Sequence, residues 1–394
     1  MDAQVRRMMQ WIAREVCDGS VEQKEKLSAV SEQELQWLYG ISASHDLAHL
    51  VGNALFRDQM LSEHSEWAAK FKKQIFLANI RYERMQLTLN SLCQTMEEEG
   101  IPFVPLKGAV LRQWYPEPWM RTSCDIDLLV RKEDLTRAGE ILTKRLSYRS
   151  EGLGSHDLSL FSPDGVHVEL HYDLMESHLI ARSDIVLQEL WDHMTVRDGW
   201  HCWYEMSDAM FYFYHIAHMA KHFEIGGCGV RPLIDLWILE HRVEHERTER
   251  DALLEKGGLL TFANACRALS DAWLSGTETD ALSAQMQEYI LHGGVYGNQE
   301  NRVVVQQVKQ GGKFSYAMSR IFLKYDVLKF HYPILMKHKW LLPVMQVRRW
   351  GHLIFCGGLN RSAGELKMNR KMSKETSASA KELMQNLGLL STIE

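Results

Sequence analysis

Apolar positions along this chain follow a helical spacing, then a strand spacing, and then a helical spacing again. Ser31 with Glu34 three positions later has the pattern of a capping box, which predicts a helix start there. Residues 77–100 predict a longer helix that ends at Gly100. Its apolar face is expected to hold Ile80, Met85, Leu87, Leu89, Leu92 and Met96.

Short apolar segments replace the helical pattern after residue 100. The Pro-Asp-Gly sequence at 163–165 separates two of them and is typical of a hairpin turn. Together these elements predict a compact α/β unit. The strand candidates span 101–108, 124–130, 157–163 and 167–174, with a helical pattern at 132–146.

From Ser207 onward the pattern is helical again. Ser207 is expected to cap one helix, and Pro232 fits the first turn of the next, with the Gly-rich residues 226–229 joining them. The predicted fold class is therefore α+β, a small mixed sheet with helices, flanked by helical N-terminal and C-terminal regions.

Composition bears on the cellular setting. Hydrophobic and charged fractions of 45% and 24% are those of an ordinary globular protein, and a net charge of −6 implies no partner by itself. The seven cysteines are scattered without a CxxC pair, which suits neither a disulfide framework nor a zinc knuckle. Neither a signal peptide nor an apolar run of roughly 20 residues is found, so we expect a cytoplasmic protein.

The segment 124–130 contains an acidic pair. Alternate residues of a strand share a face, so Asp125 and Asp127 would project together. Neighbouring carboxylates repel unless a cation lies between them, and Mg²⁺ prefers oxygen ligands. For such a pair alone, an exposed strand face is the simpler interpretation. Glu169 on the later strand adds a third acid, which favours a site for two metal ions.

Residues before the acidic strand suit nucleotide binding. Lys107 and Gly108 end a strand candidate before a short helix, whose first backbone N–H groups would be open to phosphate. Arg121 and Ser123 stand just before the acids and would supply further contacts. Each signal is weak alone, and it is their order along the chain that favours a nucleotide site.

The run from Leu106 to Val130, followed by residues 167–174, resembles the uncharacterised nucleotidyltransferase family of the DNA polymerase β-like superfamily. The resemblance implies a polymerase β-like core that transfers an NMP from an NTP to an acceptor with a hydroxyl or phosphate. It makes Asp125, Asp127 and Glu169 the catalytic residues and the ligands of two Mg²⁺ ions. The substrate-cleft residues that it implies are His218, Lys221, His222, Arg231 and Asp235. His171, two residues after Glu169 on the same face of the predicted strand, is also expected in the cleft.

The resemblance departs from the superfamily pattern at one turn. Ala109 stands where a serine is usual, and the stretch before Asp125 is longer than usual. This departure supports an alternative function, a non-catalytic nucleotide-binding regulatory or partner protein, whereas the intact acids favour the enzyme. The expected regions are a helical N-terminal region at 1–75, a nucleotidyltransferase core at 76–200, a helical domain completing the cleft at 201–300 and a basic helical region at 301–394.

Three further patterns leave alternatives open. His215, His218 and His222 share one helical face, which suits zinc, phosphate or a cleft lining, although a structural role is more common. Arg231 and Asp235 have the i,i+4 spacing of an ion pair. Residues 302–374 are strongly basic with interleaved aromatics; RNA, an anionic membrane or polyphosphate would suit them, but a solvated helix face is favoured.

Overall fold

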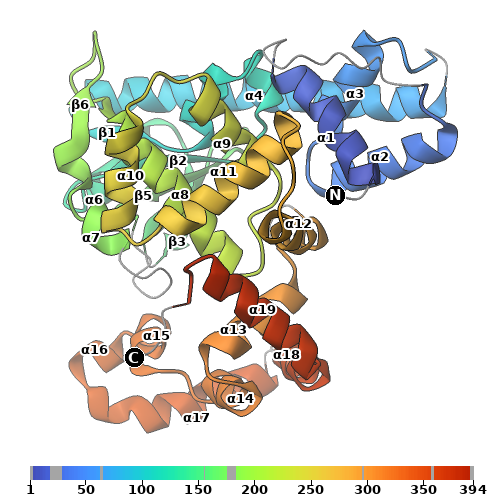
Figure 1. Cartoon of the computed structure of the whole chain (residues 1–394). Coiled ribbons are helices and arrows are strands. Elements are labelled where there is room, and N and C mark those ends of the chain that lie inside the picture. The colour runs from blue at the N-terminus through green and yellow to red at the C-terminus, as the bar shows by residue number, and fades with distance from the viewer. Residues whose placement is uncertain are drawn as a thin grey trace.

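The computed structural model shows a small mixed sheet enclosed by helices (Figure 1). A separate group of C-terminal helices lies below this body in Figure 1. The predicted α+β class is confirmed. The residues that the structure describes are 3–17, 29–62, 65–154, 156–174, 183–294, 297–355 and 359–390.

In the described residues of the N-terminal part, the helices are α1 (Ala3–Val16), α2 (Glu32–Ser44), α3 (Ala48–Arg57) and α4 (Glu66–Glu98). The predicted cap of α2 is confirmed, because the Ser31 hydroxyl accepts a hydrogen bond of 3.2 Å from the Glu34 N–H. The carboxylate of Glu34 is paired with Arg7.

The predicted long helix is α4, and it ends before Gly100, whose φ is +65°. The expected apolar face is partly wrong. Leu87 and Ile80 are 70% and 39% exposed. Leu87 is two residues from the buried Met85, and two residues turn a helix by about 200°, so the two side chains point in opposite directions. The buried members of the face are Met85, Leu89, Leu92 and Met96.

A five-stranded sheet has the order β1-β2-β5-β4-β3, and β2 and β5 are parallel while the other pairs are antiparallel. The hairpin at 163–165 is confirmed between β4 and β5. Strand β3 and a separate two-stranded sheet were not predicted. In the case of β3, the strand is exposed along its whole length and has no apolar alternation. The strands are β1 (Phe103–Pro105), β2 (Asp125–Val130), β3 (Arg149–Leu153), β4 (Asp157–Phe161), β5 (His167–His171), β6 (Met194–Val196) and β7 (Tyr204–Met206).

The two faces of the five-stranded sheet differ in character. Ile126, Leu128, Val168 and Leu170 on one face form an apolar core with α4 and α6 (Leu135–Arg145). These residues alternate with the acidic positions of β2 and β5, so the carboxylates lie on the opposite face. Burial of the apolar face thus fixes where the acids point.

The helices after the sheet include α8 (Asp208–Glu224), α9 (Arg231–His241), α10 (Arg247–Lys256) and α11 (Leu260–Leu274). The predicted cap of α8 is confirmed, since the Ser207 hydroxyl accepts from the Met210 N–H at 3.4 Å. Pro232 lies in the first turn of α9, as predicted.

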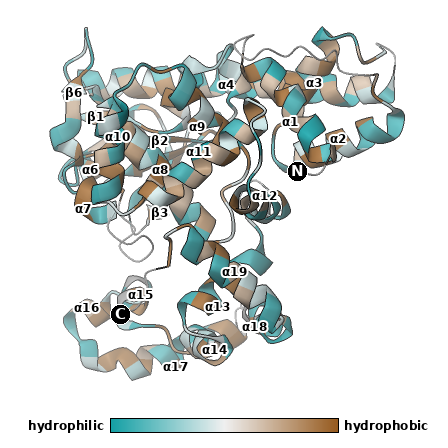
Figure 2. Cartoon of the chain, viewed as in Figure 1, coloured by the Kyte–Doolittle hydropathy of each residue, from teal (hydrophilic) through white to brown (hydrophobic). Residues whose placement is uncertain are grey.

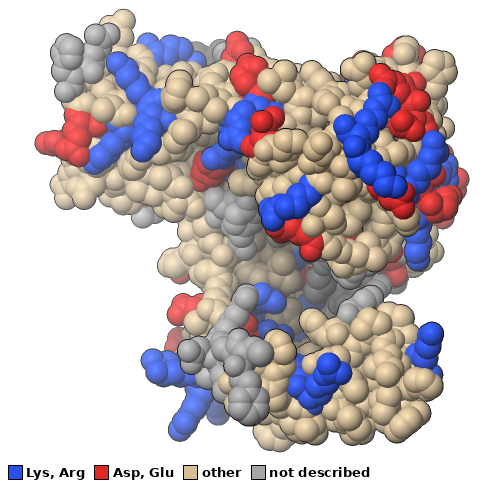
Figure 3. All heavy atoms as spheres, turned by 180° about the vertical axis from the view of Figure 1, so that it is seen from behind, with Lys and Arg blue, Asp and Glu red and all other residues tan. Residues whose placement is uncertain are grey.

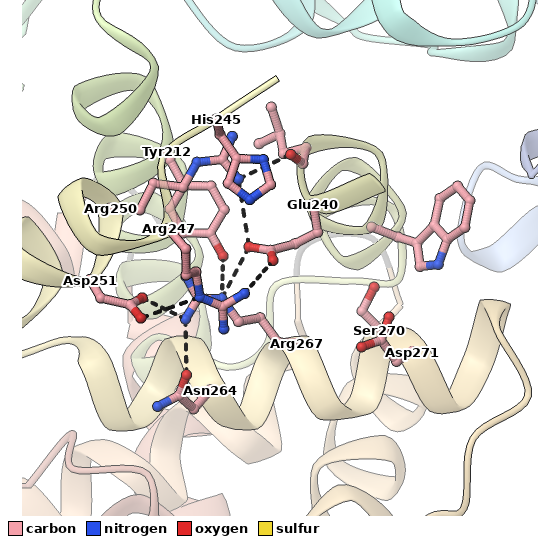
Figure 4. A network of polar contacts seen from close by, with 12 residues as sticks. Tyr212, Glu240, His245, Arg247, Arg250, Asp251, Asn264, Arg267, Ser270 and Asp271 are labelled. Atoms are coloured by element: carbon pink, nitrogen blue, oxygen red, sulfur yellow. Dashed lines mark hydrogen bonds and ion pairs between the residues drawn. The ribbon is translucent and has the colours of Figure 1, made fainter. Parts of the chain in front are cut away.

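A polar network ties these four helices together (Figure 4). Arg267 of α11 donates to the Tyr212 hydroxyl at 2.7 Å, to Glu240 at 3.0 Å and to Asp251 at 2.8 Å. Arg250 of α10 is fully buried and donates to Asp208. Charges buried this deeply are tolerated because they are paired, and the network fixes α8 relative to α9, α10 and α11.

The C-terminal helices are joined to α8 by an ion pair between Lys309 and Glu224. The remaining helices are α5 (Gly108–Leu111), α7 (Ser183–Leu187), α12 (Ala281–Gly293), α13 (Gln299–Lys309), α14 (Lys313–Ile321), α15 (Tyr325–His331), α16 (Ile334–Lys337), α17 (Leu342–Phe355), α18 (Leu359–Lys371) and α19 (Lys374–Asn386). Within the described ranges, none of the helices has the length and apolar character needed to cross a bilayer. Cys356 lies outside the described residues.

Candidate active site

The three acids come together through the register of two parallel strands. Asp127 of β2 is paired with Glu169 of β5, and Asp125 is paired with His167 one step earlier. Paired residues of neighbouring strands project to the same face. The structure therefore brings all three carboxylates into one row.

Two overlapping groups of side chains have the spacing of metal ligands. Asp125, His167 and Glu169 form one, and Asp127, Glu169 and His171 form the other; the ligand atoms of each group lie within 4.8 Å of one another. Glu169 belongs to both, which is the position of a bridging ligand. His167 is a ligand candidate that the sequence analysis missed, although its two-residue spacing from Glu169 is the same signal that gave His171.

Histidine contacts fix the orientation of these groups. His171 Nε2 lies 2.9 Å from Asp127 Oδ1 and 3.3 Å from Glu169 Oε2. Burial alone would lower the pKa of His171, but hydrogen bonds to Asp127 and Glu169 outweigh it and raise the pKa to about 9. On the neighbouring strand, Ser159 Oγ lies 2.8 Å from His167 Nε2 and holds that ring.

Lys107 provides a cation inside the acidic group. It precedes α5 with a φ of +42°, and its Nζ lies 3.2 Å from Asp127 Oδ2. Asp127 is buried, which alone would raise its pKa, but Lys107 and His171 hold the pKa well below the usual range. For Asp125, burial and then the charge of Asp127 raise the pKa. The two acids therefore have opposite shifts, and Asp127 is the one held as the anion.

The loop before β2 is closely packed. A Cβ on Gly108 would lie 3.1 Å from the Ser123 Cβ and 3.2 Å from its Oγ, so a side chain at this position would press on the loop. The Ser123 hydroxyl accepts a hydrogen bond of 3.0 Å from Arg112. Fewer backbone N–H groups at the start of α5 are open to phosphate than predicted, because the Ala109 N–H donates to the Leu106 carbonyl.

The ion pair that the spacing of Arg231 and Asp235 allowed is not formed, because each side chain has another partner. Asp235 is fully buried and accepts from Arg121 Nε at 2.8 Å and from the Tyr115 hydroxyl at 2.7 Å. Arg231 instead donates to Asp46 at 2.6 Å. Each side chain has a closer partner in the tertiary structure than the residue four positions along its own helix.

Asp46 joins four parts of the chain at the side of the cleft. Its carboxylate accepts from Arg231 of α9, from Thr122 in the loop before β2 at 2.8 Å, and from Arg81 of α4 at 3.1 Å. Asp46 has a φ of +56° just after α2. It therefore positions Arg231 at the cleft, and no short-range pattern in the sequence indicated this contact.

The three histidines on one face of α8 have two kinds of contact. His215 Nε2 lies 3.0 Å from the Pro232 carbonyl oxygen, which is a structural contact. His218 Nε2 and His222 Nε2 lie 3.1 Å apart. Burial, followed by the positive charge of Lys107, lowers the pKa of His218 well below its usual value. A neutral His218 therefore faces the acids from α8.

A cleft of about 1100 Å³, including its open mouth, joins these groups. Every predicted site residue lines it except Asp235, which lies behind it and holds Arg121. Further lining residues that the sequence analysis missed are His45, Cys124, His156 and Cys228. The cleft thus has an acidic floor on the sheet and cationic walls from α8, α9 and the loop before β2.

The donor set fits a divalent cation. Carboxylate oxygens are the ligands that Mg²⁺ prefers, and the adjacent imidazoles add nitrogen ligands that suit transition metals. A row of acids faced by Lys107, Lys221 and Arg231 defines a candidate site for metal-assisted phosphate chemistry.

Comparison with known proteins agrees with that class. Residues 31–275 match the family described as uncharacterised nucleotidyltransferase, which is more than half of the chain. The chain therefore belongs to this family, and the resemblance found in the sequence is confirmed. No curated protein and no solved structure matches the chain.

Proposed function

We propose that this protein is a Mg²⁺-dependent nucleotidyltransferase that moves an NMP from an NTP to an acceptor bearing a hydroxyl or phosphate, with release of pyrophosphate. The observation that carries the proposal is the register of β2 and β5, which places Glu169 directly beside Asp127 and one step from Asp125. Family membership supports the transfer chemistry. The proposal includes a polymerase β-like core for residues 76–200 and a cytoplasmic location.

The acids have separate roles in the proposed reaction. Bound Mg²⁺ would stabilise the charge that develops on the attacking and leaving oxygens. Asp127 is held as an anion by Lys107 and His171 and would be a permanent ligand. Asp125, with its raised pKa, and Glu169, shared between both ligand groups, would complete the ligand set, and Glu169 would help to activate the acceptor hydroxyl.

Cationic residues of the cleft would hold the triphosphate. Lys107, Lys221 and Arg231 line the same space as the acids. Arg121 is fixed by Asp235 and would act as a rigid positive wall, with Gly108 and Ser123 shaping the turn beside it. Phosphoryl transfer depends mainly on such positioning and charge stabilisation.

The non-catalytic alternative is favoured by one observation. Ala109 lacks the hydroxyl of the usual serine, and its N–H is already bonded within the turn. A protein that binds a nucleotide without turnover would tolerate this loss. The complete set of three acids supports the enzyme, because carboxylates this close together repel one another unless a cation offsets their charge.

Calorimetric titration of each non-hydrolysable NTP, with and without Mg²⁺, tests nucleotide binding at this site. Binding should require the metal and disappear in the Asp125→Asn/Asp127→Asn double variant. Asp164→Asn, in the β4–β5 turn, is the matched control and should bind as the wild type does. Equal binding by the double variant would rule out the site.

Turnover separates the enzyme from the alternative. With an NTP and a panel of hydroxyl and phosphate acceptors, Asp127→Asn and Glu169→Gln should each lower the transfer rate by at least about 100-fold, the size of effect typical of lost charge stabilisation. Metal-dependent binding without any transfer across the panel would favour the non-catalytic alternative.

A further inference from the structure

Residues 313–355, which contain α14–α17, have most of the exposed large apolar side chains in the described part of the chain. Eleven of the eighteen large apolar side chains exposed in the described part of the chain lie here, with exposed fractions of 38–78%. Figure 2 shows brown residues along α17, at the outer edge of the C-terminal group. The eleven are Phe314, Met318, Ile321, Phe322, Val327, Ile334, Met336, Trp340, Val344, Val347 and Ile354.

This surface is left exposed because the segment has only a small core. Its buried apolar cluster consists of Leu328, Leu335 and Met345, with partly buried neighbours around it. Single exposed apolar residues are normal on soluble surfaces, but a concentration of this size marks a contact site. The segment therefore presents a face that its own fold does not cover.

The same residues are strongly basic. Residues 313–355 contain eight Lys or Arg and one acidic residue. In Figure 3 the lower part of the molecule is mostly tan, with separate blue side chains on it. Apolar and basic residues alternate most closely at 336–340, Met-Lys-His-Lys-Trp. All five of these residues are exposed, and Trp340 is 75% exposed.

We propose that residues 313–355 dock this protein on an anionic lipid surface. Lys337 and Lys339 would pair with lipid phosphates, while Met336 and Trp340 would enter the boundary between headgroups and acyl chains. Tryptophan suits this depth because its ring is apolar and its N–H remains polar. The proposal stands independently of the transfer reaction.

Charge and apolar surface together favour lipid over other occupants. RNA would satisfy the lysines but would leave the aliphatic side chains of Met336, Val344 and Val347 without a partner. A second copy would bring two basic surfaces together with only one acidic residue on each to offset them. An anionic bilayer satisfies both characters at once.

Sedimentation of the full-length protein with vesicles tests the proposal. It should bind vesicles of phosphatidylcholine with phosphatidylglycerol and should not bind phosphatidylcholine alone. Lys337→Gln/Lys339→Gln should weaken binding roughly 30-fold, at about fivefold for each basic residue near an anionic surface. Met336→Ser/Trp340→Ser should weaken it by at least tenfold, an effect that high salt does not remove.

The matched control is Phe76→Ser/Leu87→Ser on α4, where two apolar side chains are similarly exposed at 62% and 70%. This variant should bind vesicles as the wild type does, and circular dichroism should show all variants folded. Three results would overturn the proposal: no binding to anionic vesicles, equal losses in the control, or binding of single-stranded RNA in place of lipid. A stable dimer that Trp340→Ser dissociates would assign the surface to a second copy instead.

Discussion

The ammonium group of Lys107 lies 3.2 Å from Oδ2 of Asp127, among the acids that would bind metal. Both groups are largely enclosed, with side-chain exposures of 24% and 4%. Lys107 has a φ of +42°, and its side chain reaches Asp127 of β2. Lys107 thus offsets the mutual repulsion of the carboxylates and competes with a cation for Asp127.

Replacing Lys107 by methionine should therefore have opposite effects on metal and nucleotide. Mg²⁺ alone should bind about tenfold more tightly, because a lysine no longer competes for the carboxylate, a difference of about 1.4 kcal/mol. The Mg²⁺–NTP complex should bind more weakly, because one phosphate contact is lost. Calorimetry with each ligand measures both, and Lys221→Met is the control that should affect only the nucleotide. Weaker binding of both ligands by Lys107→Met would contradict this role.

Asp235→Asn should destabilise the protein strongly. The variant leaves the Arg121 guanidinium buried without its counter-ion, and breaking a buried pair costs about 3–5 kcal/mol. Urea unfolding measures the loss, and Arg121→Met/Asp235→Leu should recover much of it. Asp271→Asn, on the adjacent helix at 39% exposure, should cost less than about 1 kcal/mol. Equal losses of stability at both positions would show that the buried pair contributes no more to stability than an exposed carboxylate does.

Glu224 should make stability depend on pH. Burial raises the pKa of Glu224 to about 7, although Lys309 opposes the shift. The folded protein then holds a proton that the unfolded chain has released, so the free energy of unfolding falls as pH rises from about 4.5 to 7. Between pH 4 and 8, the stability of Glu224→Gln relative to the wild type should improve by about 3 kcal/mol.

Lys309→Met tests whether Glu224 is the group that causes this pH dependence of stability. Without its counter-ion the pKa of Glu224 should rise further, so the fall in stability should still begin at about pH 4.5 but should extend to higher pH and become larger. Urea unfolding at half-unit pH intervals follows the change. A difference between Glu224→Gln and the wild type that stays constant with pH would refute the assignment.

Gly108→Ala should disturb the turn before α5 and cause only a small loss of stability. The added Cβ would lie 3.1 Å from the Ser123 Cβ and 3.5 Å from an Arg121 nitrogen, so the loop must shift. We expect a stability loss of about 1 kcal/mol, the low end for overpacking, together with weaker NTP binding. Gly40→Ala is the control, since nothing lies within 4 Å of a Cβ there, and it should stabilise α2 by about 0.5–1 kcal/mol. Unchanged NTP binding in Gly108→Ala would separate the turn from the nucleotide site.

The sequence predicted the structure correctly where the evidence was local, as in strand alternation or a helix cap. Alternation in β2 and β5 correctly separated Asp125, Asp127 and Glu169 from the apolar face. The capping serines were equally local signals, and Ser31 and Ser207 both cap as predicted. These patterns succeed because one side of each element must be buried or one terminal N–H must be bonded.

Contacts between distant segments could not be predicted in this way. The i,i+4 spacing of Arg231 and Asp235 is compatible with a pair, yet the folded chain offers Asp46 and Arg121 as closer partners. Asp46 lies 185 positions from Arg231 and has no periodic relation to it. The ranges expected for the four regions remain a prediction, and α4 runs across the boundary at residues 75 and 76.

The parallel register of β2 and β5 also has a consequence for how the chain folds. His171 and Asp127 are 44 positions apart, so pairing of their strands closes a loop that contains α6, β3 and β4. Closing such a long loop costs chain entropy before any pairing repays it, which places this step late. The acids converge in that same step, so a cation that binds them would preferentially trap fully folded molecules. Magnesium present during refolding should therefore slow unfolding more than it accelerates folding.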